Sequence, residues 1–292
     1  MRCRLERCKY KPAMTHLSAE TNFQTYNSPE VVSHYAALDY LTPCERLLFE
    51  TYVPVGGAVL DLGVGGGRTT PYLASRASRY VGVDYAEAMV EACRAKFPAV
   101  EFIITDVSDL SGFPDSCFDA VVFAFNGIDL LLPDKTRRAC LTHMHRVLKP
   151  GGVVIFSSHN ARAVLSWPNW NRERLEQMAR RGSAGSRGLE RLLQVFLTLV
   201  RSTLAFGQAL GASLLRLLRR LPLRAFWSGE GTFVDSAHGG LLTHCWTPAF
   251  AVRELSEAHF QILQIVGNDY PRANHRFATD WYYYVFAKSG DR

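Results

Sequence analysis

The stretch that most restricts the fold of this chain is AVLDLGVGGGR, at residues 58–68. Apolar residues surround Asp61 and lead into glycines at positions 63, 65, 66 and 67, and the following RTTPYLASR has the composition of a helix. We therefore expect a strand, a tight turn and a helix start. Glycines allow the backbone to turn with positive φ and a ligand to approach closely, and the helix start offers that ligand unpaired N–H groups. The pattern predicts a site for an adenosine-bearing cofactor.

The glycine spacing narrows the choice of cofactor. The dinucleotide fingerprint has glycines at its first, third and sixth positions. Gly63 and Gly65 fit the first and third positions, but the sixth is Arg68. The spacing therefore disfavours a nicotinamide cofactor.

Four later segments continue the pattern. RYVGVDYAEAMVEACR places Asp84 at the end of a second strand, and FIITDVSDL places Asp106 after a third. A fourth strand is predicted in FDAVVFAFNGIDLL. A helix end, a turn and a fifth strand are predicted in HRVLKPGGVVIFSS. With the spacing Asp61-x-Gly63-x-Gly65-x-Gly67, the chain resembles the class I S-adenosylmethionine (SAM) dependent methyltransferases. The resemblance implies a Rossmann-like α/β fold with a doubly wound, seven-stranded, mainly parallel sheet that closes in a C-terminal antiparallel hairpin.

The resemblance also implies roles for individual residues. Asp61 would help to orient the methionine end of SAM, Asp84 would bind the ribose hydroxyls, and Asp106 the adenine amino group. The acidic residues at 84 and 106 follow strand ends, where sheets of this kind bind ligands. The remaining candidates for cofactor binding are Gly63, Gly65, Gly67, Tyr85, Val107, Asn126 and Tyr35, with Tyr26 beside Tyr35 as a cover.

The pattern of apolar segments gives the expected elements. We expect strands near 57–62, 79–83, 100–104, 118–124, 152–158, 260–267 and 281–288, with the last two paired antiparallel. Helices are expected near 68–76, 85–97 and 134–148, after Pro248, and within 28–53, where one or two helices cover the first strand. Strands and helices that alternate in this way indicate a parallel sheet with crossover helices.

Composition limits the class of protein. The chain has 292 residues, of which 48% are hydrophobic, enough for a sizeable core. Its seven cysteines form no CxxC pair, which favours a reducing cytoplasmic location and disfavours a metal site. No uncharged run reaches the length of a membrane span. Residues 1–20 are expected to be a flexible basic tail, or to include sequence upstream of a true start at Met14.

Positive charge is concentrated in one insertion. Between residues 170 and 229 eleven arginines face three glutamates, a net charge of +8, whereas the whole chain carries +6 and the remainder therefore −2. This divides the chain into a SAM-binding core with an N-terminal helical cover at 21–159, an Arg/Leu-rich helical insertion at 160–235, and the C-terminal part of the core at 236–292.

The apolar face of the insertion is unusually wide. On a helical projection of residues 187–221, polar side chains fall on about a third of the circumference. Gly207 and Gly211 form a GxxxG on the apolar side, where a helix contact or a kink is expected. The segment could be a helical lid, a homodimer contact or, through 187–224, a peripheral membrane contact. A leucine-lined lid favours an apolar acceptor.

Catalytic candidates lie after the fourth and fifth strands. His159 could remove a proton from a hydroxyl acceptor, or could be a structural histidine that orders the insertion. Asn126 could point its amide at the acceptor or the cofactor, or cap the turn at Gly127. His238 and His244 are second-rank candidates, whereas His143 and His145 are expected to be structural.

We therefore expect a SAM-dependent methyltransferase, a transferase that acts on a small, apolar or lipid-like acceptor, most readily at oxygen. An RNA methyltransferase that uses the arginine-rich insertion is an alternative, but leucines rather than interleaved aromatic and polar residues accompany the arginines, so nucleic acid is disfavoured as a partner. A catalytically idle, membrane-associated SAM-binding protein is the third reading, which the intact acidic and glycine motifs disfavour.

Overall fold

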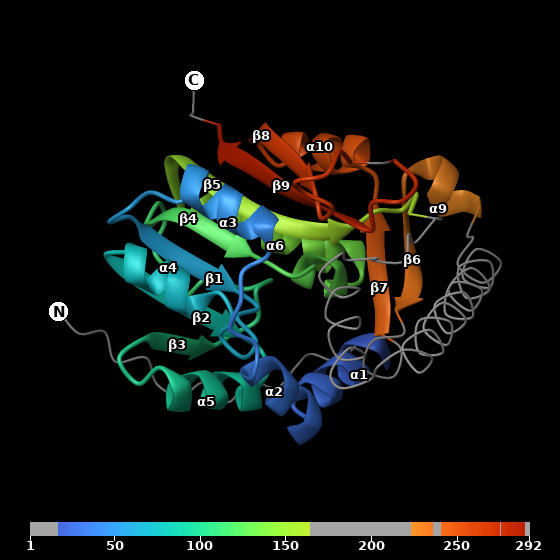
Figure 1. Cartoon of the computed structure of the whole chain (residues 1–292). Helices are drawn as coiled ribbons and strands as arrows, with labels where there is room; N and C mark the ends of the chain where they lie inside the picture. The colour runs from blue at the N-terminus through green and yellow to red at the C-terminus, as the bar shows by residue number, and fades with distance from the viewer. Residues whose placement is uncertain (1–16, 164–222, 236–240, 275, 290–292) are drawn as a thin grey trace, which may run out of the picture.

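Seven strands form one twisted sheet with the spatial order β3-β2-β1-β4-β5-β9-β8 (Figure 1). The computed structural model describes residues 17–163, 223–235, 241–274 and 276–289. β1 to β5 run parallel, whereas β9 pairs antiparallel with both β5 and β8. The strands of this sheet are β1 (Ala58–Leu62), β2 (Arg79–Asp84), β3 (Glu101–Ile104), β4 (Phe118–Phe123), β5 (Leu148–His159), β8 (Phe260–Gly267) and β9 (Trp281–Lys288).

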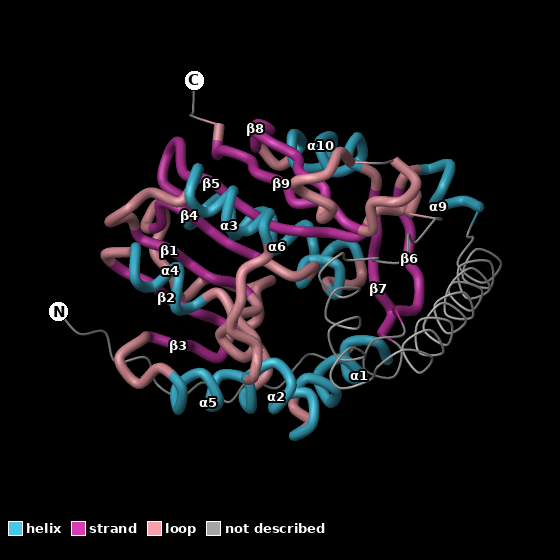
Figure 2. Tube along the Cα trace, in the orientation of Figure 1, coloured by secondary structure: helices cyan, strands magenta, loops and turns pink. Residues whose placement is uncertain are grey.

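Helices cover both faces of this sheet (Figure 2). Buried side chains of α6 (Asp134–Val147) and α10 (Pro248–Glu257) pack on one face. Those of α3 (Pro43–Tyr52), α4 (Thr70–Arg76) and α5 (Glu87–Lys96) pack on the other. Strands buried on both faces need apolar residues at nearly every position, which is why β4 reads FDAVVF. The predicted Rossmann-like sheet and its closing antiparallel hairpin are confirmed, with strand ends close to the expected positions.

Two elements differ from the sequence prediction. A second, two-stranded antiparallel sheet forms from β6 (Glu230–Asp235) and β7 (Leu241–Trp246), preceded by the short helix α9 (Leu223–Ser228). The predicted insertion at 160–235 therefore ends in a regular strand, and β7 starts what was expected to be only a return segment. Figure 1 shows this hairpin at one end of the large sheet, next to the carboxyl end of β5, and a bridge between Asn160 and Trp246 joins the two.

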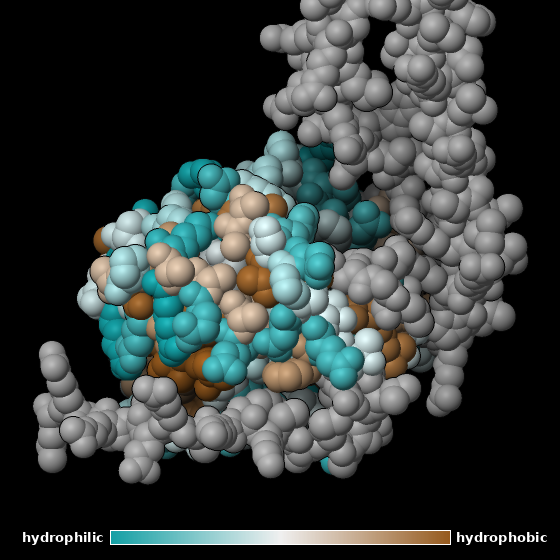
Figure 3. Space-filling view, turned by 90° about the horizontal axis from the view of Figure 1, so that it is seen from below, coloured by the Kyte–Doolittle hydropathy of each residue, from teal (hydrophilic) through white to brown (hydrophobic). Residues whose placement is uncertain are grey.

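The other difference lies at the N-terminus. α1 (Leu17–Tyr26) begins inside the segment expected to be a flexible tail, and α2 (Pro29–Ala36) follows it. Both helices lie below the sheet, where hydrophilic residues cover most of the visible described surface and apolar residues form patches between them (Figure 3). Of the one or two helices predicted within 28–53, with a break near Pro43, the structure has two, α2 and α3, and α3 begins at Pro43.

Several predictions fall outside the described residues. Most of the arginine- and leucine-rich insertion, with Gly207 and Gly211, lies in 164–222, and His238 lies in 236–240. The lid, dimer and membrane interpretations of the insertion therefore stay predictions from sequence. Among the described residues, no helix is long and apolar enough to cross a membrane.

Candidate active site

The glycine turn after β1 forms one wall of a cavity of about 200 Å³. Gly63 and Gly65 have φ values of +58° and +53°, which residues with a side chain rarely adopt. A Cβ at Gly66 would lie 2.3 Å from the carbonyl carbon of Tyr35. The turn is therefore both conformationally and sterically restricted to glycine, and it packs directly on the cover that precedes α3.

Asp84, at the end of β2, is fixed against the same turn. Its Oδ2 accepts a hydrogen bond from the backbone N–H of Gly65 at 2.9 Å, and its Oδ1 accepts one from the N–H of Ala86 at 2.9 Å. Burial raises the pKa of this carboxyl, although these backbone donors oppose the shift. Asp84 faces the cavity, so it can accept hydrogen bonds from ligand hydroxyls without any movement of β2.

Two further carboxylates line the cavity. Asp61 is 1% exposed and accepts hydrogen bonds from Thr69 Oγ1 at 2.6 Å and Tyr80 OH at 2.8 Å. Burial raises the pKa of Asp61 to about 6, although these two donors lower it. Asp106, after β3, accepts hydrogen bonds from Ser108 N and Oγ at 2.8 and 2.7 Å. Carboxylates at the ends of three neighbouring strands thus meet at one edge of the sheet.

Aromatic rings from the N-terminal helices close the cavity on the opposite side. Tyr26 of α1 lies 6.0 Å from Tyr35 of α2 and 6.4 Å from Tyr85, between ring centroids. Phe23 of α1 lies 5.9 Å from Tyr85. The side chain of Asn22 on the same helix also lines the cavity and is 5% exposed, and its Oδ1 has no hydrogen-bond partner. Sequence analysis missed Asn22 and Phe23 because they lie outside any motif.

The cavity brings together most of the predicted cofactor residues. Asp61, Gly63, Gly65, Asp84, Tyr85, Asp106, Val107 and Tyr35 all line it. Gly67, Asn126 and His159 are not among its lining residues. Their predicted roles stay predictions. Asn126 lies in the chain between the lining residues Phe125 and Gly127, and His159 lies next to Asn126.

Arg68 links the glycine turn to the helical cover. Its guanidinium donates two hydrogen bonds to the carboxylate of Glu45 on α3 and one to the backbone oxygen of Tyr40 at 2.8 Å. The rings of Tyr40 and Phe125 lie 5.3 and 4.6 Å from its central carbon. The residue that breaks the dinucleotide spacing is therefore a buried cation that joins three segments, a role that the spacing alone does not reveal.

Asn126 and His159 meet beyond the ends of β4 and β5. Asn126 has φ +62° and begins the 3₁₀ helix η1 (Gly127–Leu130). Its Nδ2 lies 3.4 Å from His159 Nε2. On the other side of the ring, His159 Nδ1 lies 2.7 Å from Oδ2 of Asp129, which also accepts the backbone N–H of His159 at 2.8 Å.

Asp129 is a functional candidate that sequence analysis missed. It is fully buried, and its Oδ1 accepts the hydroxyl of Ser158. Burial alone would raise its pKa, but the two nearby imidazoles hold the pKa below its usual value. An ionised carboxylate on Nδ1 holds the proton of neutral His159 there and leaves Nε2 as the basic nitrogen.

The chemistry of the cavity lining fits SAM. Three carboxylates and one unpartnered amide oxygen face it, which suits a ligand with ribose hydroxyls, an adenine amino group and an ammonium group. The glycine turn provides the close backbone approach that such a ligand needs. The residues present therefore fit the cofactor that the sequence resemblance implies.

Two solved structures with a related fold are methyltransferases. A 1,6-didemethyltoxoflavin N1-methyltransferase from Burkholderia thailandensis, with bound S-adenosylhomocysteine, aligns over 96% of this chain and 94% of its own, with a TM-score of 0.55 and 15% identity. A SAM-dependent methyltransferase from Methanosarcina mazei aligns over 87% of this chain and all of its own, with a TM-score of 0.51 and 16% identity. At these identities the likeness concerns the fold.

Comparison of the sequence with known proteins identifies the kind of domain that the chain contains. A demethylmenaquinone methyltransferase from Clavibacter sepedonicus is 37% identical over 106 residues, 35% of this chain and 41% of its own length. A fatty-acid O-methyltransferase from Mycolicibacterium smegmatis is 32% identical over 126 residues, 40% of this chain and 42% of its own. The chain thus spans about two fifths of the length of these relatives. Residues 59–152 match the family described as a methyltransferase domain, so the chain contains a class I methyltransferase domain whose cofactor is SAM.

Proposed function

We propose that the chain is an active methyltransferase that transfers the methyl group of SAM to a hydroxyl oxygen of a small apolar or lipid-like acceptor. SAM supplies an electrophilic methyl group on a sulfonium. The observation that carries the oxygen assignment is the pair Asp129–His159, because it presents a basic imidazole nitrogen at the edge where the cofactor carboxylates also lie. His159 takes the hydroxyl proton as the new oxygen–carbon bond forms.

The lining of the cavity supports an apolar acceptor. Beyond the three carboxylates, the wall formed by the end of β4 and η1 consists of Phe123, Ala124, Phe125, Leu130, Leu131 and Leu132. A polar acceptor would leave its hydrogen-bonding groups unpaired against these side chains, at a cost of about 1–3 kcal/mol for each group. The two similar proteins named above for demethylmenaquinone and fatty acids also have apolar substrates.

Methyl transfer to a matched pair of acceptors tests the proposal. A phenol or quinol must lose a proton, whereas a fatty-acid carboxylate needs no base. Transfer of radiolabelled methyl from SAM to the hydroxyl acceptor should fall about 10²–10⁴-fold in His159→Gln, with transfer to a carboxylate and SAM affinity nearly unchanged. Equal loss with both acceptors would contradict the role of His159. Nitrogen-methylated products alone would contradict the oxygen assignment.

Asp84→Ala tests the cofactor site separately. Loss of the charge-assisted hydrogen bonds to ribose should weaken SAM binding by about two powers of ten, measured by titration calorimetry. A variant that binds SAM as tightly as the wild type would remove Asp84 from the cofactor site.

Contact with a membrane surface or a second subunit through residues 187–224 is a further proposal, supported by the sequence of that segment alone.

A further inference from the structure

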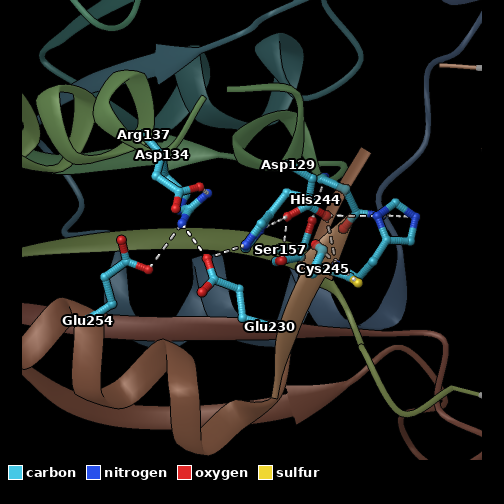
Figure 4. Close-up of polar contacts among 12 residues, drawn as sticks. Asp129, Asp134, Arg137, Ser157, Glu230, His244, Cys245 and Glu254 are labelled. Carbon is cyan, nitrogen blue, oxygen red and sulfur yellow. Dashed lines mark hydrogen bonds and ion pairs between the residues drawn. The ribbon is translucent and has the colours of Figure 1, made fainter. Parts of the chain in front are cut away.

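A buried chain of charged groups continues from His159 away from the cavity. It joins η1, β5, β6, β7, α6 and α10 through side chains that are far apart in the sequence (Figure 4). Its members, which we call the charge network, are His159, Asp129, His244, Glu230, Arg137 and Glu254.

His244 is the central member of the charge network. It is 1% exposed, and Figure 4 shows it between Asp129 and Glu230. Its Nε2 lies 3.1 Å from Glu230 Oε1, within hydrogen-bond distance. Its Nδ1 lies 3.8 Å from Asp129 Oδ1, too far for a hydrogen bond, so Asp129 acts on it through charge. Burial lowers the pKa of His244, but the two carboxylates outweigh burial and raise it.

Glu230 connects His244 to a buried guanidinium. Glu230 Oε1 accepts a hydrogen bond from Arg137 at 2.8 Å, and Arg137 lies 3.4 Å from Glu254 Oε2. Hydrogen bonding to His244 is the main reason that the pKa of Glu230 is lowered. The buried network thus holds three carboxylates, one guanidinium and two imidazoles, and it is neutral only when both imidazoles are protonated.

We propose that His244 is held as an imidazolium that shares Asp129 with His159, and that this buried cation keeps His159 neutral and ready to accept a proton. The inference rests on the proposed role of His159 as the base. His244 touches neither cofactor nor acceptor in this scheme, so it is a positioning residue that acts through Asp129.

The charges around His159 explain why such a cation is needed. Among the described residues, the charged groups in contact with the two imidazoles are Asp129, Glu230 and Asp235, with Arg137 behind Glu230. Asp129 lies at Nδ1 of His159, and Asp235 Oδ2 lies 4.0 Å from its Nε2. Carboxylates at both ends of an imidazole favour its charged form, which cannot act as a base. A cation on the far side of Asp129 offsets this attraction.

Proton transfer from the acceptor also changes the net charge of the network. When the acceptor hydroxyl gives its proton to His159 Nε2, the buried network changes from one net negative charge to neutrality. No oxidant, reductant or further reactant takes part. The proton can then leave through the exposed part of His159, whose side chain is 19% exposed.

Nitrogen NMR of the wild-type protein tests the protonation of His244 without any acceptor. In uniformly ¹⁵N-labelled protein, both ring nitrogens of His244 should carry a proton at pH 7.5. A neutral His244 ring at pH 7.5 overturns the proposal. This measurement is independent of methyl transfer, so its failure is distinguishable from the failure of the proposed function.

Variants of the network test the coupling. In His244→Gln, a larger fraction of His159 should be protonated than in the wild-type protein at the same pH, measured by the same NMR experiment. The acid limb of the kcat/KM profile for a phenol acceptor should move up by about one pH unit, giving a loss that approaches about tenfold at the acid end of the profile and disappears near pH 8.5. Glu230→Gln should act in the same direction, and His143→Gln, outside the network on α6, should leave the profile unchanged. An unshifted protonation of His159 in both network variants overturns the coupling.

Discussion

Asp61 shows how burial and ligand charge combine at one residue. Its folded-state pKa of about 6 lies above the 3.8 of an unburied aspartate. In the protein without cofactor, the folded state therefore binds the proton more tightly than the unfolded state. Stability is greatest below pH 4 for this group and falls as the pH rises to about 6, by roughly 3 kcal/mol at most.

We predict that SAM binding depends on the ionisation of Asp61. SAM carries an ammonium group and a sulfonium, so it binds best when Asp61 is charged. SAM affinity should rise as the pH increases from 5 to 7, with net release of a proton near pH 6. Titration calorimetry in two buffers of different ionisation enthalpy measures this release, and Asp61→Asn should abolish it. A proton release that persists in that variant would assign it to another group.

Arg68 and Glu45 give a second prediction at this scale. Both side chains are buried, so Arg68→Ala leaves the Glu45 carboxylate without a counter-charge, with only the backbone N–H of Thr42 as a donor, and should cost about 3–5 kcal/mol in the free energy of unfolding. Arg46→Ala removes an exposed pair with Glu50 and should cost at most about 1 kcal/mol. Urea unfolding of both variants decides the matter. Equal, small losses would mean that the buried pair is replaceable by water.

At the scale of elements, the turn from β4 into η1 is strained. Phe125 and Asn126 are consecutive non-glycine residues with φ near +60°, and such residues cost about 1–3 kcal/mol each. Asn126 N donates to Ser157 Oγ at 2.8 Å, so the turn is held by β5. The conformation directs the amide of Asn126 to His159 on one side and the ring of Phe125 to Arg68 on the other.

We predict that this strain serves the chemistry rather than the fold. Asn126→Gly relieves the backbone and removes the amide, so the free energy of unfolding should change by less than about 1 kcal/mol while kcat falls about tenfold. Ser116→Gly relieves a comparable turn with φ +51° before β4 and should leave kcat unchanged. Full activity in Asn126→Gly would show that the amide is dispensable.

The elements that could be predicted are those whose signal is local. β1 is a short apolar run followed by a glycine, β2 is one that ends in Asp84, and β4 is marked by the apolar run FDAVVF alone. α1 has only a weak amphipathic pattern in LSAETNFQTY, and it is positioned by ring contacts with Tyr85. β6 was hidden because EGTFVD is short and polar, and its pairing partner is a separate segment.

The residues of the candidate site also fall into those with a local sequence signal and those without one. The cofactor carboxylates follow strand ends, so strand order predicts that they meet. The partnership of Asp129 with His159 and His244 joins positions 30 and 115 residues apart, and no spacing rule connects them. The only sequence signal for a special role of Arg68 is that it stands at the sixth position of the dinucleotide fingerprint, where a glycine is usual.

At the scale of the whole molecule, charge separates the insertion from the rest of the chain. The insertion carries about all of the excess positive charge. From the sequence of 187–224 we predict that the intact protein floats with anionic vesicles at low salt, because its arginines would attract lipid phosphates and its leucines would enter the interface. A protein in which a Gly/Ser linker replaces 187–224 should stay in the soluble fraction.

Two results would decide against membrane contact. Intact protein that remains soluble with anionic vesicles at low salt would contradict it directly. Flotation that is equal with neutral and anionic vesicles would contradict the role of the arginines.

The separation of the β6–β7 hairpin from the main sheet bears on how such enzymes diversify. The hairpin borders the end of β5 but contributes no strand to the sheet that holds the cofactor cavity. In principle the β6–β7 hairpin could be exchanged between related proteins without a change to the main sheet, and such an exchange could alter the choice of acceptor. In this protein, however, the hairpin also contains Glu230 and His244. His244 lies between Glu230 and Asp129 of η1, so the hairpin is coupled electrostatically to the main domain. Under the role proposed for His244, a successful graft would have to bring a cation to that position.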